Sequence, residues 1–122
     1  MNFELSEEQS MLRDSVSRFM ADRYSFADRR RFIAGEHGFD PAIWRAYADL
    51  GLLALPFGPE DGGVGGGPVE LMIVMEALGR ALAVEPYLST VVIGASILSA
   101  ATAAQRAGLV PAIASGELKL AF

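Results

Sequence analysis

The sequence predicts an all-α domain, a bundle of about five helices with crossing axes, which is followed by the start of a β-strand. Two capping boxes mark helix starts near the two ends of the 122 residues, Ser6-Glu7-Glu8-Gln9 and Thr102-Ala103-Ala104-Gln105. Between them, apolar residues recur at helical spacing in several stretches. Apolar and polar residues alternate as in a strand only at the end, where Leu118, Leu120 and Phe122 share one side.

The first helix is expected to begin after Ser6 and to end in the arginine run at 29–31. Its apolar positions are Leu12, Val16, Phe19, Met20, Ala27 and Phe32. Acidic residues at the start and arginines at the end suit the helix dipole. The arginine run is therefore interpreted as a solvated last turn, with an anion site as the alternative.

The second helix is expected to begin at Asp40-Pro41, a cap followed by a proline at the first helical position. Its apolar face is formed by Ile43, Trp44, Tyr47 and Leu50, and Gly51 is expected to end it. Pro68 is expected to open a third helix. The apolar stripe of that helix is predicted to be Leu71, Met72, Met75, Leu78 and Leu82.

A glycine-rich loop, "PEDGGVGGGPVE" at 59–70, joins the second helix to the third. Two phosphate-binding signatures fail there. A GxxxxGK[ST] loop needs lysine after Gly67, and a GxGxxG fingerprint needs glycine where Pro68 stands. No lysine or arginine lies within the loop. The loop is therefore interpreted as a sharp connection between packed helices.

The stretch at 86–104, "PYLSTVVIGASILSAATAA", carries no charged residue. Its length would suit a membrane span, but Ser, Thr, Gly and Ala make up more than half of it. We therefore expect a helix buried on nearly all sides, which faces another domain, a ligand or another subunit. The lone strand that follows would leave its backbone groups unpaired. We thus expect domains at 1–117 and 118–122, with the second continuing past Phe122.

Composition excludes several classes of function. The net charge of -5 argues against nucleic-acid binding, and the absence of cysteine excludes disulfides and thiolate metal sites. No signal peptide is recognisable, so a soluble cytoplasmic protein is expected. The single histidine, His37, is expected in an exposed turn. The acidic pairs Glu7-Glu8 and Glu60-Asp61 are expected to be solvated, and no metal site is predicted.

Four stretches, taken in order, resemble the N-terminal helical domain of the acyl-CoA dehydrogenase family. They are "LSEEQSMLRDSVSRFM", "FDPAIWRAYADLGLLALPFGPEDGGVGG", "ELMIVMEALGRALAVEPYLST" and "AAQRAGLVPAIASGELKLAF". The resemblance covers essentially the whole chain, and its specificity lies in the order and spacing of the four pieces. The sequence departs from the family pattern at Asp61, where a bulkier residue is common, and at Gly66-Gly67, which lengthen the glycine run.

The resemblance implies an enzyme whose later domains carry the chemistry. FAD would lie between a middle β-domain and a C-terminal helical bundle, and Phe122 would be the first residue of the flavin-contacting motif. The glutamate that takes the α-proton of the acyl-CoA would lie beyond residue 122, so no catalytic residue is assigned here. Electrons would pass to an electron-transfer flavoprotein, and the protein would form a homo- or hetero-oligomer that acts in fatty-acid or lipid metabolism.

The resemblance also implies that the uncharged helix lines the acyl-chain pocket. The residues expected to form this wall are Val84, Tyr87, Leu88, Val91, Val92 and Ala95, and a plain interdomain core is the alternative for each. "AVEPYLST" in addition resembles members that act on bulky acyl groups and pair as two different subunits. A non-catalytic helical interaction module, or a degenerate subunit of a heteromer, is the alternative function.

Overall fold

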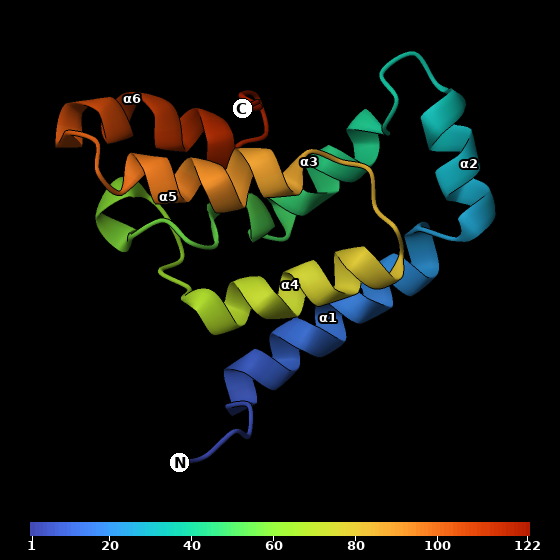
Figure 1. The fold of residues 1–122 in the computed structure, drawn as a ribbon, viewed down its shortest axis with the longest axis horizontal. Coiled ribbons are helices and arrows are strands. Elements are labelled where there is room, and N and C mark those ends of the chain that lie inside the picture. Colours follow the sequence, from blue (N-terminus) through green and yellow to red (C-terminus); the bar gives the residue numbers. More distant parts are fainter.

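The computed structural model describes all 122 residues, Met1–Phe122, and it contains six α-helices and no β-strand. α1 (Glu7–Arg23) and α4 (Pro68–Arg80) lie side by side in one layer (Figure 1). α5 (Gly94–Leu98) and α6 (Ala103–Ala114) form a second layer. α3 (Pro41–Asp49) lies between the layers, and α2 (Phe26–Ala34) stands at one end of the molecule. The prediction of an all-α domain is confirmed.

The prediction of one long N-terminal helix was wrong, because the chain turns between α1 and α2. The turn contains a capping box that the sequence reading missed. The Ser25 hydroxyl accepts from the Asp28 amide, and the Asp28 carboxylate accepts from the Ser25 amide, both at 3.1 Å. Such a cap starts a new helix. The turn brings Tyr24 into the core, where its ring packs edge-on against Phe32.

The other helix starts are as predicted. The Ser6 hydroxyl accepts from the Gln9 amide at 3.1 Å, and the Thr102 hydroxyl accepts from the Gln105 amide at 3.2 Å. Asp40 caps α3, and Pro41 is its first residue. After α3 the chain reverses at Gly51, which has a φ of 76° that glycine adopts without strain. Two short 3-10 turns follow, η1 (Leu52–Ala54) and η2 (Pro59–Asp61).

The main core lies between α1, α3, η1, α4 and the start of the uncharged helix. Its largest fully buried side chains include Tyr47, Tyr87, Ile43, Leu52 and Leu53. Leu50, predicted on the apolar face of α3, is instead exposed. The stripe predicted for α4 was also partly wrong, since Met72 and Leu82 are exposed whereas Ile73, Val74 and Ala77 are buried. The reason is that α4 packs against α1 as well as against the central core, so two of its sides are covered.

Residues 88–98 of the uncharged stretch form one continuous helix in two parts, a π-helical segment η3 (Leu88–Ile93) and then α5, and the stretch ends in a turn and the first residues of α6. One side is buried in this chain, through Tyr87, Thr90, Val91, Gly94 and Leu98. Leu88, Ile93 and Ile97 are exposed on the other side. The chain by itself therefore covers only part of the helix that was expected to be buried nearly all round. None of the helices has both the length and the apolar character that a membrane crossing requires.

Residues 118–122 follow α6 without regular secondary structure. Leu118 and Leu120 are half-buried and pack against a second, smaller core of Phe57, Leu98, Val110 and Ile113. Their common side is the one that the alternation predicts. The β-domain expected from residue 118 onward remains a prediction.

Candidate functional site

An apolar pocket of about 420 Å³ opens where α2, α4 and the segment at 82–88 meet. Its apolar lining consists of Met75, Leu78, Leu82, Ala83, Val84, Tyr87 and Leu88, and the remaining lining residues are Arg29, Gly79 and Glu85. A second pocket of about 410 Å³, between α3 and residues 115–119, is lined by polar residues apart from Trp44 and Pro41. An apolar ligand therefore suits the first pocket better than the second.

The structure divides the six residues that were expected to line an acyl pocket. Val84, Tyr87 and Leu88 line the apolar pocket, and Leu88 is 52% exposed. Val92 and Ala95 are half-buried farther along the same helix. Val91 is fully buried in the main core. Tyr87 is buried too, and its hydroxyl donates to the Leu52 carbonyl at 2.9 Å. Tyr87 and Val91 thus hold the helix against the core, and the others remain accessible.

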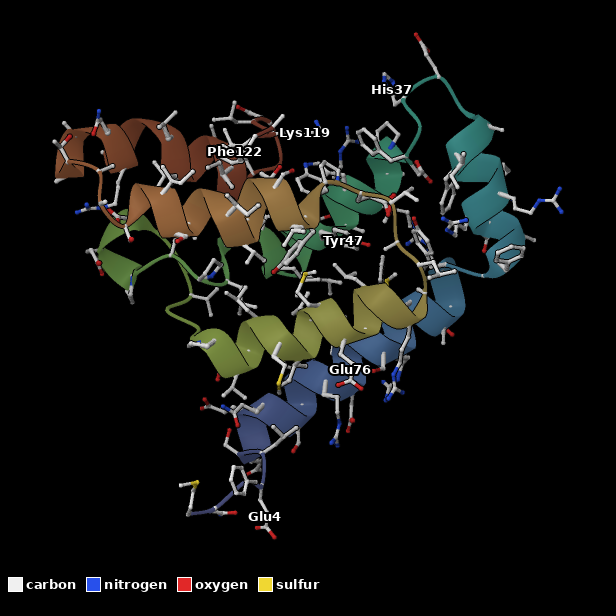
Figure 2. The ribbon with its side chains drawn as sticks, viewed as in Figure 1. Glu4, His37, Tyr47, Glu76, Lys119 and Phe122 are labelled. Carbon is white, nitrogen blue, oxygen red and sulfur yellow. The ribbon has the colours of Figure 1, made fainter.

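A buried carboxylate, Glu85, lies behind the pocket. Its side chain is 6% exposed, and each oxygen accepts from a tyrosine. Tyr24 donates to Oε2 at 3.1 Å, and Tyr47 donates to Oε1 at 3.5 Å. Figure 2 shows Tyr47 between the two helical layers. Burial raises the pKa of Glu85 and also those of both tyrosine hydroxyls, because each charged form loses its hydration.

The sequence reading missed this cluster and treated Glu85-Pro86 only as a helix start. The signal that could have found it is a single glutamate directly before a long uncharged stretch, in a chain with buried tyrosines to pair with it. The cluster joins α1, α3 and the beginning of the uncharged helix, three elements that are distant in sequence. It therefore fixes the place where that helix enters the core.

The rim of the pocket is held by the corner between α1 and α2. Leu82 has a φ of 53°, a left-handed conformation that costs a non-glycine residue about 1–2 kcal/mol. Arg29 Nε donates to the Leu82 carbonyl at 2.7 Å, and the Val84 amide donates to the Tyr24 hydroxyl at 3.0 Å. Arg29 is thus half-buried and hydrogen-bonded, and the prediction of a solvated arginine turn holds only for Arg30 and Arg31.

The glycine loop folds back onto the turn that precedes it. The amides of four consecutive residues, Gly63, Val64, Gly65 and Gly66, donate to backbone carbonyls of residues 54–58 at 2.7–3.0 Å. A Cβ on Gly63 would overlap the Phe57 backbone, so the close approach requires glycine. These amides have no hydrogen left for an anion. The loop is also tied to α6 by an ion pair of 2.9 Å between Asp61 and Arg106, both mostly buried.

The remaining candidates lie apart from the pocket. His37 is exposed at the tip of the α2–α3 connection (Figure 2), as the sequence predicts, and its ring centroid is 6.0 Å from that of Phe39. Glu7, Glu8 and Glu60 are exposed as well, whereas Asp61 is held by its ion pair.

Phe122 is 70% exposed at the end of the chain, beside Lys119 (Figure 2). An exposed aromatic ring could stack on one edge of a flavin. The main pockets have volumes of about 250–420 Å³, and none of them is lined by Phe122. The amides of Gly63, Val64, Gly65 and Gly66 are already bonded to carbonyls of residues 54–58, so they are not available to the phosphates of a dinucleotide. The residues of this chain therefore do not form a site that holds FAD by themselves, and a contact between Phe122 and the flavin stays a prediction.

Comparisons with known proteins agree with this architecture. The chain is 36% identical to the acyl-CoA dehydrogenase IpdE2 of Mycobacterium tuberculosis over 96 residues, 78% of this chain and 30% of that protein. It is 32% identical to the probable acyl-CoA dehydrogenase YngJ of Bacillus subtilis over 100 residues, 80% of this chain and 26% of that protein. The chain thus spans about a third or less of the length of these relatives.

Solved structures of other proteins also contain this fold. A chain of the ChsE4–ChsE5 complex from Mycobacterium tuberculosis superimposes with a TM-score of 0.87 at 29% identity, over 98% of this chain and 33% of that chain. A variant of the Tcur3481–Tcur3483 steroid ACAD superimposes with a TM-score of 0.84 at 27% identity, over 93% of this chain and 31% of that chain. The family model described as acyl-CoA dehydrogenase, N-terminal domain, matches residues 6–117, and the chain therefore belongs to the acyl-CoA dehydrogenase family as its N-terminal helical domain.

Proposed function

We propose that the protein containing this domain is a FAD-dependent acyl-CoA dehydrogenase and that the domain supplies one wall of its acyl pocket. The observation that carries this proposal is the apolar pocket of about 420 Å³ at the start of the uncharged helix, together with the exposed apolar side that continues along that helix. A hydrocarbon chain lowers its free energy by leaving water for such a surface.

The wall residues divide into two roles. Val84 and Leu88 would touch the acyl chain at the pocket, and Val92 and Ala95 would extend the apolar surface along the helix. Tyr87 and Val91 would support the wall from the core side, since both are fully buried. The domain would thus hold the acyl chain in apolar surroundings and exclude water from it.

The reaction is the oxidation of the bond between the α- and β-carbons of an acyl-CoA thioester. A base would take the α-proton, and the chemistry that bound FAD would supply is that of a hydride acceptor for the β-carbon. Within this chain we assign no residue to the proton step, because the buried Glu85 is occupied by two tyrosines and faces the core. Phe122 would lie against an edge of the cofactor, and the base would lie beyond residue 122.

We further propose that the protein works in the cytoplasm with two kinds of partner. An electron-transfer flavoprotein would take up the electrons. A second acyl-CoA dehydrogenase chain would complete a hetero-oligomer, with a homo-oligomer as the alternative. The hetero-oligomer is supported by the solved relatives, since one is a complex of ChsE4 with ChsE5 and another joins Tcur3481 with Tcur3483.

The full-length protein tests this proposal. We expect it to purify with a flavin absorbance that bleaches when an acyl-CoA is added. Replacing Leu88 by Trp should fill the pocket and raise the KM for longer acyl-CoA substrates. The matched control Met72→Trp changes a similarly exposed residue of α4 that lines neither the pocket nor the uncharged helix, and it should leave KM unchanged. A colourless protein that neither binds FAD nor oxidises acyl-CoA would instead support a non-catalytic helical subunit.

A further inference from the structure

The uncharged helix holds the C-terminal residues of the chain through one side chain, that of Thr90. Thr90 is fully buried, and its hydroxyl makes two hydrogen bonds to the same residue. It accepts from the Leu120 amide at 3.0 Å and donates to the Leu120 carbonyl at 3.4 Å. One side chain thus satisfies both backbone groups of Leu120, as a neighbouring strand would do.

The close approach at this point also depends on Gly94. A Cβ on Gly94 would lie 2.9 Å from Leu120 Cδ1, so any larger residue would require the Leu120 side chain to shift. Thr90 lies within the π-helical segment, and Gly94 follows it directly. Because hydrogen bonds in a π-helix run from residue i to i+5, a residue and the fourth after it lie nearly in line. Thr90 and Gly94 therefore lie next to each other on the side of the helix that faces Leu120.

The side of the helix that contains Thr90 and Gly94 is opposite to the side that contains the proposed acyl wall. Leu88 is two residues from Thr90, and Val92 is two residues from both Thr90 and Gly94. Two residues correspond to about half a turn of a helix. One side thus faces the apolar pocket and the exposed surface, and the other holds the segment that leads to Phe122. Apart from Thr90, the only backbone bond from Leu118–Phe122 to the helical body is from the Leu118 amide to the Ala112 carbonyl, at 3.0 Å.

We propose that Thr90 is a positioning residue that sets the distance between the acyl-pocket wall and the segment Leu118–Phe122. This inference rests on the proposed function, because it concerns where the acyl chain lies relative to the residues that follow Phe122. Two reacting groups that are held by different segments react efficiently only when the segments keep a fixed spacing, and an error of about 1 Å can lower a rate by about a hundredfold.

The full-length protein provides the test, with Thr90→Val as the main variant. Valine has the shape of threonine and lacks the hydroxyl, so the core stays filled while both bonds to Leu120 are lost. We expect hydrogen exchange of the Leu120 amide to accelerate by about tenfold or more, since one lost bond corresponds to about that factor. We also expect kcat/KM to fall by about tenfold or more. Thr90→Ser keeps the hydroxyl and should restore both quantities to within about threefold of the wild-type values.

Two controls and a second variant test whether the effects are specific to the contact between Thr90 and Leu120. Ser89→Ala removes the adjacent hydroxyl, which bonds only to the Pro86 carbonyl, and it should change neither quantity. Gly94→Ala leaves Thr90 intact and requires the Leu120 side chain to shift, so it should change both quantities in the same direction as Thr90→Val but by a smaller factor. Gly108→Ala, at a helical glycine with open space around its Cβ position, controls for the change in helix propensity.

Three results would overturn the inference. Unchanged Leu120 exchange in Thr90→Val and Gly94→Ala would mean that Thr90 does not hold the segment. Faster exchange with unchanged kcat/KM would mean that Thr90 only anchors the chain and does not position reacting groups. A wild-type protein without flavin or dehydrogenase activity would overturn the proposed function and the positioning role with it, while the exchange data would still report whether Thr90 holds Leu120.

Discussion

Replacing Tyr24 by Phe should destabilise the protein more than the loss of any other tyrosine hydroxyl. The Tyr24 hydroxyl accepts from the Val84 amide and donates to Glu85, so one atom serves two partners. No buried side-chain polar atom in this chain lacks a hydrogen-bond partner. Phe would remove this partner from two groups at once, the half-buried Val84 amide and Oε2 of the buried Glu85.

The structure allows the size of the effect to be worked out. A hydrogen bond to a charged group contributes about 1.5–3 kcal/mol, and an unsatisfied buried donor costs about 1–3 kcal/mol. Local relaxation recovers part of this sum, so we expect Tyr24→Phe to lower the free energy of unfolding by about 2–4 kcal/mol. Domains of this size are stable by about 5–15 kcal/mol, so the loss would be a large fraction of the total.

The assay is urea unfolding followed by the fluorescence of Trp44, the only tryptophan of the sequence. The other two tyrosines serve as matched controls. Tyr87→Phe loses one bond of 2.9 Å to a neutral carbonyl and should cost about 1–2 kcal/mol. Tyr47→Phe loses only long contacts, 3.5 Å to Glu85 and 3.8 Å to the Met20 sulfur, and should cost less than about 1 kcal/mol.

The cost of Tyr24→Phe should also depend on pH. Burial raises the pKa of Glu85 above its usual 4.5, so its contribution to stability is present below pH 4.5 and is lost as the pH rises through the raised value. The Tyr24 bond opposes this shift, because it stabilises the charged form. Without the Tyr24 bond, the ionised Glu85 carboxylate should destabilise the folded state further. The loss of unfolding free energy in Tyr24→Phe should therefore grow from acidic toward neutral pH. A pH-independent cost, or an order in which Tyr47→Phe is the most damaging, would refute the reasoning.

Five further substitutions test local features of the fold by the same assay. Gly63→Ala should cost more than about 2 kcal/mol because its Cβ would overlap the preceding turn, whereas Gly62→Ala meets no atom and should cost only about 1 kcal/mol for its φ of 88°. Leu82→Gly should stabilise the protein by about 0.5 kcal/mol, since it relieves the left-handed strain at a 56% exposed residue; unchanged stability would contradict this. Asp61→Asn should cost about 1–2 kcal/mol by breaking the ion pair between the loop and α6, and a negligible loss would show that the pair contributes nothing. Hydrogen bonding from Gln9 lowers the pKa of Glu70. The contribution of Glu70 to the free energy of unfolding is therefore present above pH 4.5 and is lost as the pH falls through the lowered value. Glu70→Gln should make the free energy of unfolding less dependent on pH in this acidic range.

The sequence predicted best those features that depend on local chemistry. The capping boxes at Ser6 and Thr102 and the cap at Asp40 lie where the structure has them, because each requires only residues within one helical turn. By the same rule the break between α1 and α2 could have been predicted, since Ser25-x-x-Asp28 is itself a capping box. It was missed because the arginine run beyond it suited the end of a longer helix.

Features that depend on which helices pack together were not predictable from a single sequence. The buried side of α4 differs from the predicted stripe because α1 covers a second side of that helix. The apolar pocket combines residues from α2 and α4 with Val84, Tyr87 and Leu88, which only the family resemblance had singled out. Arg29 and Glu85 were missed because their partners, Leu82, Tyr24 and Tyr47, lie far away in the chain.

Three features that local rules disfavour lie within one short segment, residues 82–90. Leu82 has a positive φ, Glu85 is a buried carboxylate, and Thr90 lies in a π-helical turn with its hydroxyl inside the core. A buried carboxylate paired by hydrogen bonds is seldom more stabilising than an apolar residue of similar size, and a glycine would remove the strain at Leu82. Departures of this kind are expected where a protein positions a functional surface at a cost in stability. All three flank or hold the helix that forms the proposed acyl wall, which is why we place the function of the domain in residues 82–95 and not in the glycine loop.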